Sequence, residues 1–332
     1  MPAFKKVEGP VRMVFLGCGS ITRKHAKTLK TFEGVQLYFA SRTEKKAIEF
    51  SKAHKGFGYF GSYTDAILSP DIDVVFIATP PDSHFQLAVE AMNGGKHVIV
   101  EKPPFFSSAD FDIIDELRHQ HGTQLMVAEN YFYKPLLKSL QLVIKDNFIG
   151  DIKFMFFNAT KTQHVNDWRG EKKMAGGGAL FEGGIHWINF ISNIGLTIKS
   201  VTGFQPGSNT RKQPMELSMQ VVAAYEEGAI GTLFYSWEVN ALLKGLRLSK
   251  IYGSNGSITF ESNGLFIFVR GNKWKVIFPG LNNIGGTKFM FTDFIHALRI
   301  GEEPRFSFGL AKRDVMLIEQ AYETAVIPGE NT

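Results

Sequence analysis

The sequence has 332 residues, no long apolar run and a single cysteine. A membrane-spanning helix needs about 18 consecutive apolar residues, and no such stretch occurs. Cys18 cannot form a disulfide within the chain, which fits a reducing compartment. No apolar segment of signal-peptide type precedes the first predicted strand. We therefore expect a cytoplasmic protein with no membrane partner.

The sequence also has no block of like charges and no cluster of residues typical of a metal site. The net charge is only +5, and the basic residues are scattered, so nothing indicates a nucleic-acid partner. Neither the nine histidines nor Cys18 show ligand spacing, and we predict no metal. A Gly-x-Ser-x-Gly elbow and a Walker A sequence are also missing.

The first part of the chain alternates strand and helix patterns. Apolar runs of strand length cover 11–16, 35–40, 73–78, 97–100 and 124–128, and helical patterns cover 21–32, 43–54, 83–93 and 107–121. Continuous apolar strands separated by helices are typical of a parallel sheet buried on both faces. We predict an α/β domain of Rossmann type, with a doubly wound parallel sheet that binds a dinucleotide, over residues 1–130.

The rhythm changes after about residue 150, where strand patterns follow one another. They cover 152–160, 218–225, 229–237, 246–252, 257–261, 265–270 and 273–278, and helices are expected at 183–194, 288–299 and 309–325. For residues 131–332 we predict an α+β domain that binds substrate. It should contain a large, mostly antiparallel open sheet with helices on one face. The other face is expected to form a homodimer or homotetramer.

A glycine-rich turn, Gly17-Cys18-Gly19-Ser20-Ile21-Thr22, follows the first strand and opens the first helix. Gly17 permits the tight turn, and Gly19 lets the backbone approach a pyrophosphate at the helix N-terminus. Thr22 occupies the third glycine position of the fingerprint, so an ordinary strand–helix turn is the alternative. The context favours cofactor contacts from Gly17, Gly19, Ser20 and Ile21.

The second predicted strand ends in Ser41 and Arg42, without the acidic residue that usually binds the ribose hydroxyls of NAD. Ser41 and Arg42 could instead bind a 2′-phosphate, which favours NADP over NAD. Alternatively, Arg42 stacks over adenine or points into solvent. NAD therefore stays possible.

Two further loops follow predicted strands at the carboxyl edge of the sheet, where ligands bind. Lys102, held between a strand end and Pro103, could bond a substrate hydroxyl and the nicotinamide ribose, although a lysine after a strand is often a solvated loop residue. These loops, with the end of the strand at 124–128, supply the other predicted cofactor contacts: Thr79, Pro80, His84, Glu101, Lys102 and Asn130.

A second glycine cluster, at residues 176–178, leads into the predicted helix that carries Glu182 and His186. Side chains four residues apart share a helix face, so the carboxylate can orient the imidazole. Oxidation of an alcohol needs a base for the hydroxyl proton, and histidine titrates in a suitable range. We predict catalytic roles for Lys102, His186 and Glu182, the alternative being a surface ion pair on a helix.

Together these motifs resemble the Gfo/Idh/MocA oxidoreductase family, which includes glucose–fructose oxidoreductase and inositol dehydrogenase. The likeness spans nearly the whole chain and includes Gly17-x-Gly19 with His25, Thr79-Pro80 with His84, Glu101-Lys102-Pro103, Trp168-Arg169, the Gly-Gly-Ala-Leu-x-(acid)-x-Gly-x-His pattern and 252–256. It implies hydride transfer between nicotinamide and a sugar, polyol, nucleotide sugar or related carbonyl. It also implies that Lys102 is the active-site lysine, that His186 is the catalytic histidine and that the Lys102–Pro103 bond is cis.

Two positions depart from the family pattern. Glu182 stands where the family usually has Asp, and Asn189 stands at a position often held by Asp. These changes could alter substrate choice or abolish activity, so a catalytically inactive dinucleotide sensor is the alternative function, with a methyltransferase a distant third. Polar and aromatic residues complete the predicted substrate contacts: Tyr131, Tyr133, His164, Trp168, Arg169 and Asn189.

Overall fold

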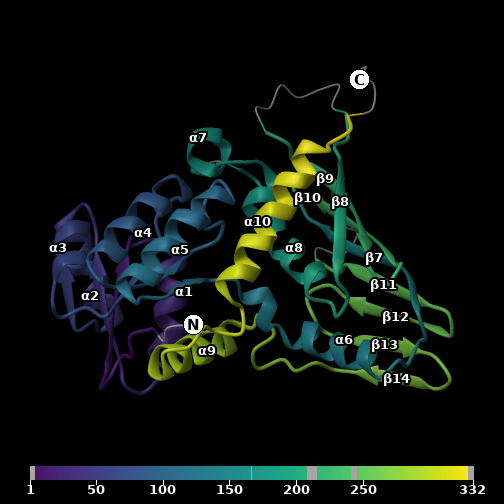
Figure 1. Cartoon of the computed structure of the whole chain (residues 1–332), viewed down its shortest axis with the longest axis horizontal. Helices are drawn as coiled ribbons and strands as arrows, with labels where there is room; N and C mark the ends of the chain where they lie inside the picture. Colours follow the sequence, from purple (N-terminus) through teal and green to yellow (C-terminus); the bar gives the residue numbers. More distant parts are fainter. Residues whose placement is uncertain (1–3, 166, 208–214, 241–244, 328–332) are drawn as a thin grey trace. The chain divides into compact units, whose positions relative to one another are not determined.

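The computed structural model describes residues 4–165, 167–207, 215–240 and 245–327 (Figure 1). The chain divides into two compact units, one of residues 1–128 with 288–312 and the other of residues 129–287 with 313–332. Residues 288–312, which the sequence analysis assigned to the second domain, group with the first unit. The division into a dinucleotide-binding domain of residues 1–130 and a substrate-binding and oligomerisation domain of residues 131–332 stays a prediction.

The first unit is a doubly wound α/β fold. Six parallel strands lie in the order β3-β2-β1-β4-β5-β6, which is the Rossmann order. They are β1 (Val11–Leu16), β2 (Val35–Ala40), β3 (Gly58–Phe60), β4 (Val74–Ile77), β5 (His97–Val100) and β6 (Leu125–Val127). The helices are α1 (Ser20–Leu29), α2 (Glu44–His54), α3 (Tyr63–Leu68), α4 (His84–Asn93), α5 (Ala109–His121) and most of α9 (Thr287–Ile300). The predicted Rossmann fold is confirmed.

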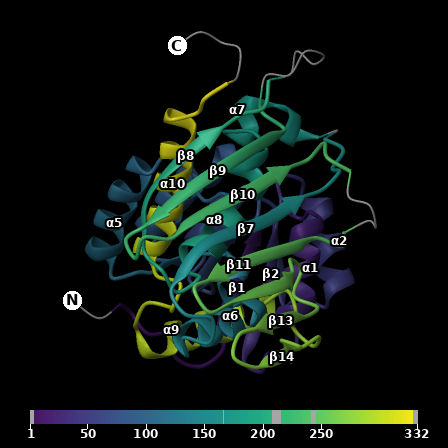
Figure 2. The ribbon, with the colours of Figure 1, turned by 90° about the vertical axis from the view of Figure 1, so that its right-hand side faces the viewer.

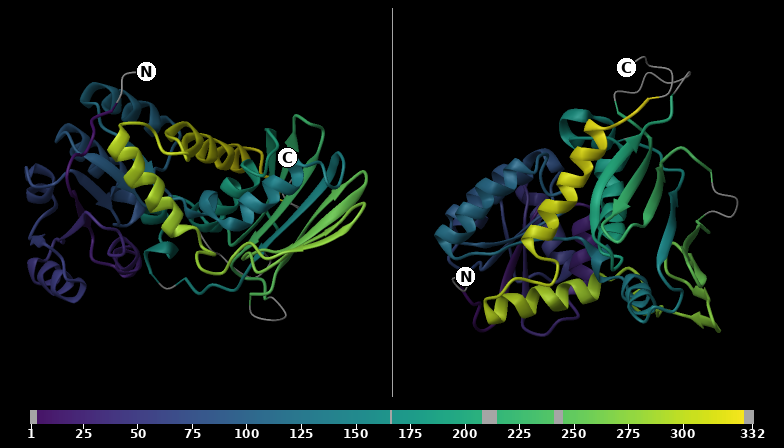
Figure 3. Two further views of the ribbon diagram at one scale, coloured as in Figure 1. Left: turned by 90° about the horizontal axis from the view of Figure 1, so that it is seen from below. Right: turned by 45° about the vertical axis from the view of Figure 1, so that its right-hand side comes forward.

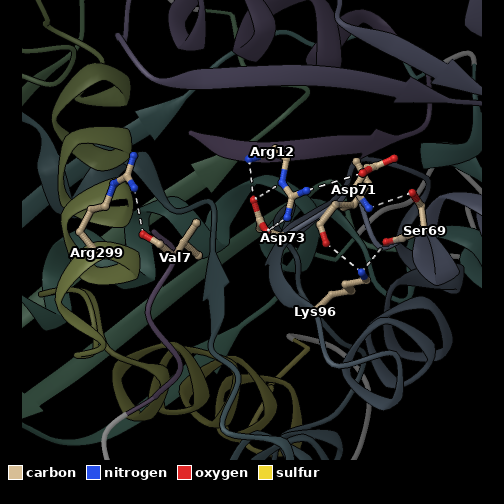
Figure 4. A network of polar contacts seen from close by, with 8 residues as sticks. Val7, Arg12, Ser69, Asp71, Asp73, Lys96 and Arg299 are labelled. Carbon is tan, nitrogen blue, oxygen red and sulfur yellow. Dashed lines mark hydrogen bonds and ion pairs between the residues drawn. The ribbon is translucent and has the colours of Figure 1, made fainter. Parts of the chain in front are cut away.

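Polar contacts tie the amino ends of the central strands together (Figure 4). Arg12 at the start of β1 donates from Nη2 and Nε to the two carboxylate oxygens of Asp73, at 2.7 and 3.0 Å. Nearby, the buried ammonium of Lys96 donates to the carbonyl oxygens of Ser69 and Ile72. A two-point arginine–carboxylate contact has a defined geometry. The amino edge of the sheet is therefore bonded internally, while the loops with the predicted motifs lie at the carboxyl edge.

The second unit contains an eight-stranded sheet in the order β14-β13-β12-β11-β7-β10-β9-β8. Neighbouring strands are antiparallel except for β7 and β10, which are parallel, so the predicted α+β fold is confirmed. The strands are β7 (Ile152–Thr160), β8 (Ile198–Phe204), β9 (Ser218–Tyr225), β10 (Ile230–Ser236), β11 (Leu248–Gly253), β12 (Gly256–Glu261), β13 (Ile267–Arg270) and β14 (Trp274–Ile277). The helices are α6 (Pro135–Lys145), α7 (Lys172–Ala175), α8 (Ile185–Ser192) and α10 (Phe308–Glu323), whose first residues group with the first unit.

One face of this sheet is covered and the other is open. Figure 2 views the sheet from its open side, with α8 and α10 behind the strands. Along β7 and β10, buried Met155, Phe157 and Leu233 alternate with exposed Phe154 and Phe234, as expected for strands with one solvated face. Within the described residues, no helix covers this second face (Figure 3).

No helix among the described residues is both long and apolar enough to cross a membrane. The cytoplasmic location stays a prediction.

Candidate functional site

The glycine turn of the first unit is tightly packed at Gly17 and open at Gly19. Gly17 has φ +106°, and a Cβ there would lie 2.7 Å from the carbonyl oxygen of Ala78, so no side chain fits. Gly19 immediately precedes α1, and a Cβ there would meet no atom within 4 Å. Backbone bounded by open space at a helix N-terminus suits an anionic group. Ser20 and Ile21 are the first two residues of that helix.

Thr22 shows why the third glycine of the fingerprint can be replaced. Its side chain is fully buried, and Oγ1 donates a 2.7 Å hydrogen bond to the carbonyl oxygen of Gly17. The hydroxyl therefore closes the turn from inside, and the threonine does not occupy the open side next to Gly19.

The end of β2 carries a cation and no carboxylate. Ser41 is buried and its Oγ accepts a hydrogen bond from the backbone N–H of Thr43, so its hydroxyl hydrogen stays available for another acceptor. Arg42 is exposed. Burial raises the pKa of Tyr63, and the neighbouring Arg42 opposes that rise. Arg42 thus lies within electrostatic range of Tyr63 on α3.

His84 holds the two other predicted cofactor loops together. It is fully buried, with Nε2 2.9 Å from the carbonyl oxygen of Thr79 and Nδ1 3.0 Å from that of Pro103. Burial lowers the pKa of His84, although the two carbonyl groups counteract this. His84 thus holds the loops of Thr79 and Pro103 together from the interior, and the direct cofactor contact expected of it stays a prediction. The Lys102–Pro103 bond is cis, as the resemblance implied, and Lys102 is half-buried.

Glu101 also lies in the interior. Its carboxylate contacts Nε2 of His25 and accepts the backbone N–H of Lys102 at 3.2 Å. Burial disfavours the ionised form, but the pKa of Glu101 is lowered because His25 and Lys102 outweigh burial. The His25 ring packs against Phe76 and Phe291 at centroid distances of 5.2 and 5.3 Å. Glu101 therefore fixes the backbone next to Lys102, and its expected cofactor contact stays a prediction.

In the second unit, a carboxylate and an aromatic ring hold His186. Its Nδ1 lies 2.7 and 2.8 Å from the two carboxylate oxygens of Glu129. The Tyr131 ring stacks on the imidazole at a centroid distance of 4.6 Å and an interplanar angle of 13°. The side chain of Glu129 is 2% exposed and that of His186 is 18% exposed. The ring is therefore fixed through one nitrogen and one face while part of it stays accessible.

Glu182 does not have the place that the helical spacing predicted. The carboxylate on Nδ1 of His186 is that of Glu129, whereas Glu182 accepts a 3.0 Å hydrogen bond from Nε of Arg169. Residues 180–184 form a π-helical turn that leads into α8.

Close packing at the start of this π turn explains why residue 178 is a glycine. A Cβ on Gly178 would lie 1.8 Å from Oε2 of Glu216. The Glu216 carboxylate accepts hydrogen bonds from the Leu180 backbone N–H at 2.9 Å and the Tyr322 hydroxyl at 2.8 Å. Glu216 therefore bonds an N–H group at the start of the helical segment that carries His186.

Asn189 lies inside the second unit. It is fully buried, and its Nδ2 donates a 2.7 Å hydrogen bond to Oδ2 of Asp314 on α10. Burial raises the pKa of Asp314 to about 6, even though Arg313 and Asn189 both favour the ionised form. The amide of Asn189 thus bonds a buried carboxyl group, and the substrate contact expected of Asn189 stays a prediction.

The remaining predicted residues of the second unit differ in their partners and in their burial. Asn130 donates to the carbonyl oxygen of Gly285. Arg169 binds Asp167 and stacks over the ring of Trp168 at 4.4 Å. Tyr133 is buried, whereas His164 is exposed.

Two family profiles match the chain in succession. The profile of an oxidoreductase family with an NAD-binding Rossmann fold matches residues 11–129, and that of the GFO/IDH/MocA C-terminal domain matches residues 137–259. The chain belongs to the Gfo/Idh/MocA oxidoreductase family. As a member of this family it has an NAD(P)-binding Rossmann fold.

Its relatives in the family are distant in sequence but similar over the full length. The 4-carboxy-2-hydroxymuconate-6-semialdehyde dehydrogenase of Sphingobium sp. is 26% identical over 306 residues, which are 90% of this chain and 93% of that protein. The 3-ketoreductase KijD10 of Actinomadura kijaniata, solved with NADP and TDP-benzene, has a TM-score of 0.83 at 18% identity and covers 96% of this chain and 98% of its own. The WlbA dehydrogenase of Bordetella pertussis, solved with NADH and UDP-GlcNAcA, has a TM-score of 0.80 at 19% identity and covers 96% of both chains.

The sequence analysis of this Gfo/Idh/MocA member missed three buried ionisable residues near His186. Glu129 could have been found, because it follows the sixth strand directly at the carboxyl edge, beside Asn130 and Tyr131. Lys134 is 4% exposed, lies 4.2 Å from the centroid of the Tyr131 ring, and has a pKa lowered by burial to about 8. Neither Lys134 nor Asp314 stands in a motif that marks it out in the sequence.

Proposed function

We propose that this chain is an NADP-linked dehydrogenase or reductase acting on a CH–OH group, or the matching carbonyl, of a sugar, polyol, nucleotide sugar or related compound. The relatives named above support the reaction class, since they are named a dehydrogenase or a ketoreductase. Solved relatives hold NADP in one case and NADH in the other, so NAD stays possible.

The residues of the first unit fit the dinucleotide. Open space beside Gly19 at the start of α1 suits the pyrophosphate, and Ser41 with Arg42 suits a 2′-phosphate. Thr79, Pro80 and Lys102 belong to the loops that would approach the nicotinamide side, and His84 and Glu101 hold those loops in place. When bound, the nicotinamide supplies the site that accepts or donates hydride.

The observation that carries the catalytic part of the proposal is the His186 ring, held at Nδ1 and still partly exposed. In the oxidation direction His186 takes the proton of the substrate hydroxyl, and in reduction it returns a proton to the carbonyl oxygen. Lys102 stabilises the negative charge that develops on that oxygen. Glu182 holds Arg169, which can bond an acidic or hydroxyl-bearing part of the substrate, with Tyr131 and Trp168 as apolar walls.

The experiment is a two-stage assay. Thermal melts with NADP, NAD or S-adenosylmethionine come first, because a ligand that binds only the folded state raises the midpoint. Nicotinamide absorbance with a panel of polyols, sugars and nucleotide sugars then detects turnover. Lys102→Ala and His186→Asn should each lower kcat by roughly 10²-fold or more while the NADP-induced melting shift persists. His119→Asn, on the exposed surface of α5, is the control and should leave kcat unchanged. Retained turnover in Lys102→Ala would overturn the assignment of that lysine.

The cofactor preference is tested separately at Arg42. Arg42→Ala should weaken NADP binding about tenfold or more and leave NAD binding nearly unchanged, since only NADP carries the charged group that Arg42 would bind. Lys52→Ala, exposed at the far end of α2, is the matched loss of one positive charge. Equal losses for NADP and NAD would contradict the 2′-phosphate role.

We also propose that the open face of the large sheet joins copies of the chain into a homodimer or homotetramer. Phe154 on β7, Ile230 on β10 and Tyr252 on β11 are 61%, 45% and 43% exposed, and they lie side by side in the sheet register. An apolar patch of neighbouring residues favours self-association. Light scattering should give a dimer or tetramer mass for the native chain and a monomer mass for Phe154→Glu. Leu142→Glu, exposed on α6, is the control.

A further inference from the structure

The tautomer of His186 can be read from its partner. An ionised carboxylate only accepts hydrogen bonds, so the nitrogen that faces it carries the hydrogen. Both carboxylate oxygens of Glu129 lie within 2.8 Å of Nδ1 of His186. In the neutral ring, Nε2 is then the nitrogen with the free lone pair, as a proton acceptor requires.

Glu129 is itself held in a fixed position. It precedes the 3₁₀ helix Asn130–Tyr133, and its Oε1 accepts the backbone N–H of Tyr131 at 2.8 Å. The same tyrosine presents its ring to the imidazole, so one short segment fixes both the edge and the face of His186. A partner with so little exposed surface cannot rotate away without breaking these contacts.

The carboxylate of Glu182, in the segment between the glycine cluster at residues 176–178 and His186, has another partner. The Glu182 carboxylate accepts a 3.0 Å hydrogen bond from Nε of Arg169, whereas the carboxylate bonded to Nδ1 of His186 is that of Glu129.

We infer that Glu129, not Glu182, is the positioning residue that sets the tautomer and orientation of His186. This inference rests on the proposed function for its consequence in catalysis, because it makes Nε2 the atom that exchanges the substrate proton. Other charged groups act on this pair, since Lys134 and Asp314 lie within electrostatic range of Glu129.

The first test measures the tautomer and needs no substrate. The full chain is labelled with ¹⁵N-histidine, and long-range ¹H–¹⁵N spectra are recorded at pH 8, with the His186 signals assigned from the spectrum of His186→Gln. Native protein should show a protonated Nδ1 and an unprotonated Nε2. Glu129→Gln should shift both nitrogens toward intermediate values, because an amide can donate as well as accept. Glu182→Gln, the matched loss of one charge, should leave the pattern unchanged.

The second test uses kinetics. Glu129→Gln should lower kcat by roughly 10²- to 10⁴-fold with KM changed less than about threefold, as expected when a base loses its orienting carboxylate. The pH midpoint of the acidic limb of its rate profile should also move. Glu182→Gln should change KM more than kcat.

Three results would overturn the inference: a protonated Nε2 in native protein, an unchanged tautomer in Glu129→Gln, or a tautomer lost only in Glu182→Gln. If Glu129→Gln does not fold, the native spectrum still decides between the two tautomers. If no substrate is turned over, the proposed function fails while the tautomer test retains its answer.

Discussion

Each unit of the molecule contains a buried carboxylate bonded to a histidine, and the two pairs differ in what surrounds them. In the first unit Glu101 follows β5 and bonds His25 of α1, with side chains 9% and 5% exposed. In the second unit Glu129 follows β6 and bonds His186 of α8, with side chains 2% and 18% exposed. Both carboxylates thus come from the end of a parallel strand, and both rings come from a helix.

The difference lies in the imidazole. His25 packs against two phenylalanine rings, so a change of its charge would act on the fold. His186 packs against one tyrosine and retains exposed surface, so a change of its charge can act on a ligand. A carboxylate–histidine pair is therefore structural in the first unit, where both side chains are enclosed. In the second unit, where the histidine is accessible, the same pair is suited to proton transfer.

The largest expected effect is on the enclosed pair. Glu101→Gln should lower the free energy of unfolding of the first unit by about 3–5 kcal/mol, because it leaves one partner of a buried pair without its counter-charge. Glu129→Gln should cost the second unit only about 1–2 kcal/mol, since water reaches His186. Denaturant titration followed by hydrogen exchange of each unit measures both values. Equal losses would remove the distinction between the two pairs.

The next effect separates the units by pH. The pKa of Asp314 is raised to about 6 in the folded state, so the folded protein keeps this proton at pH values where the unfolded chain has lost it. The stability that this group contributes therefore falls as the pH rises from about 4 to about 6. The lowered pKa of Glu101 has the opposite sign: its contribution is lost as the pH falls through the folded value. Asp314→Asn should therefore remove a stability change on the order of 3 kcal/mol between pH 4 and 6. An unchanged pH slope in this variant would contradict the assignment.

A smaller effect distinguishes structure from binding within the first unit. Gly17→Ala should destabilise that unit by about 1–3 kcal/mol, because φ is positive and the new methyl group meets the Ala78 carbonyl. Gly19→Ala should leave the melting midpoint nearly unchanged and weaken NADP binding about tenfold or more, since its methyl group enters open space next to the helix N-terminus. Calorimetry with and without NADP separates the two outcomes, and equal NADP affinity in Gly19→Ala would contradict this site.

The smallest effect provides a reporter for the first unit alone. Burial raises the pKa of the Cys18 thiol to about 11, so alkylation by iodoacetamide at pH 8 should be roughly 100-fold slower than for free cysteine. Glu101→Gln should accelerate this reaction, and Glu129→Gln should not. Acceleration by both variants would show that the two pairs are energetically coupled.

The parts of the fold that follow local rules could be predicted from the sequence. The turn at Gly17 and Gly19 and the loop at Lys102 follow continuous apolar strands, and both strand and turn are encoded within a few residues. β3 was missed because it is three residues long and half-exposed, and β8 because its pattern is only weakly apolar. These edge strands depend on their neighbours more than on their own composition.

The partners of the candidate site were harder to predict. His186 and Glu129 are 57 residues apart in the chain, and Asn189 and Asp314 are 125 apart, so no local spacing connects them. The four-residue spacing of Glu182 and His186 suggested a pair on one α-helical face, but His186 bonds Glu129 and Glu182 bonds Arg169. Sequence periodicity assumes a regular helix, and irregular turns occur often at functional sites.

The division of the chain has a consequence for the order in which the protein is made. The segment that brings Phe291 to His25 and Glu303 to Arg118 is synthesised about 160 residues after β6. At roughly 5–20 residues per second, the nascent first sheet waits about 10–30 s on the ribosome before its covering segment emerges. During that interval the surface that Phe291 covers is available to chaperones, so the speed of translation through the second unit sets how long the first unit stays incomplete.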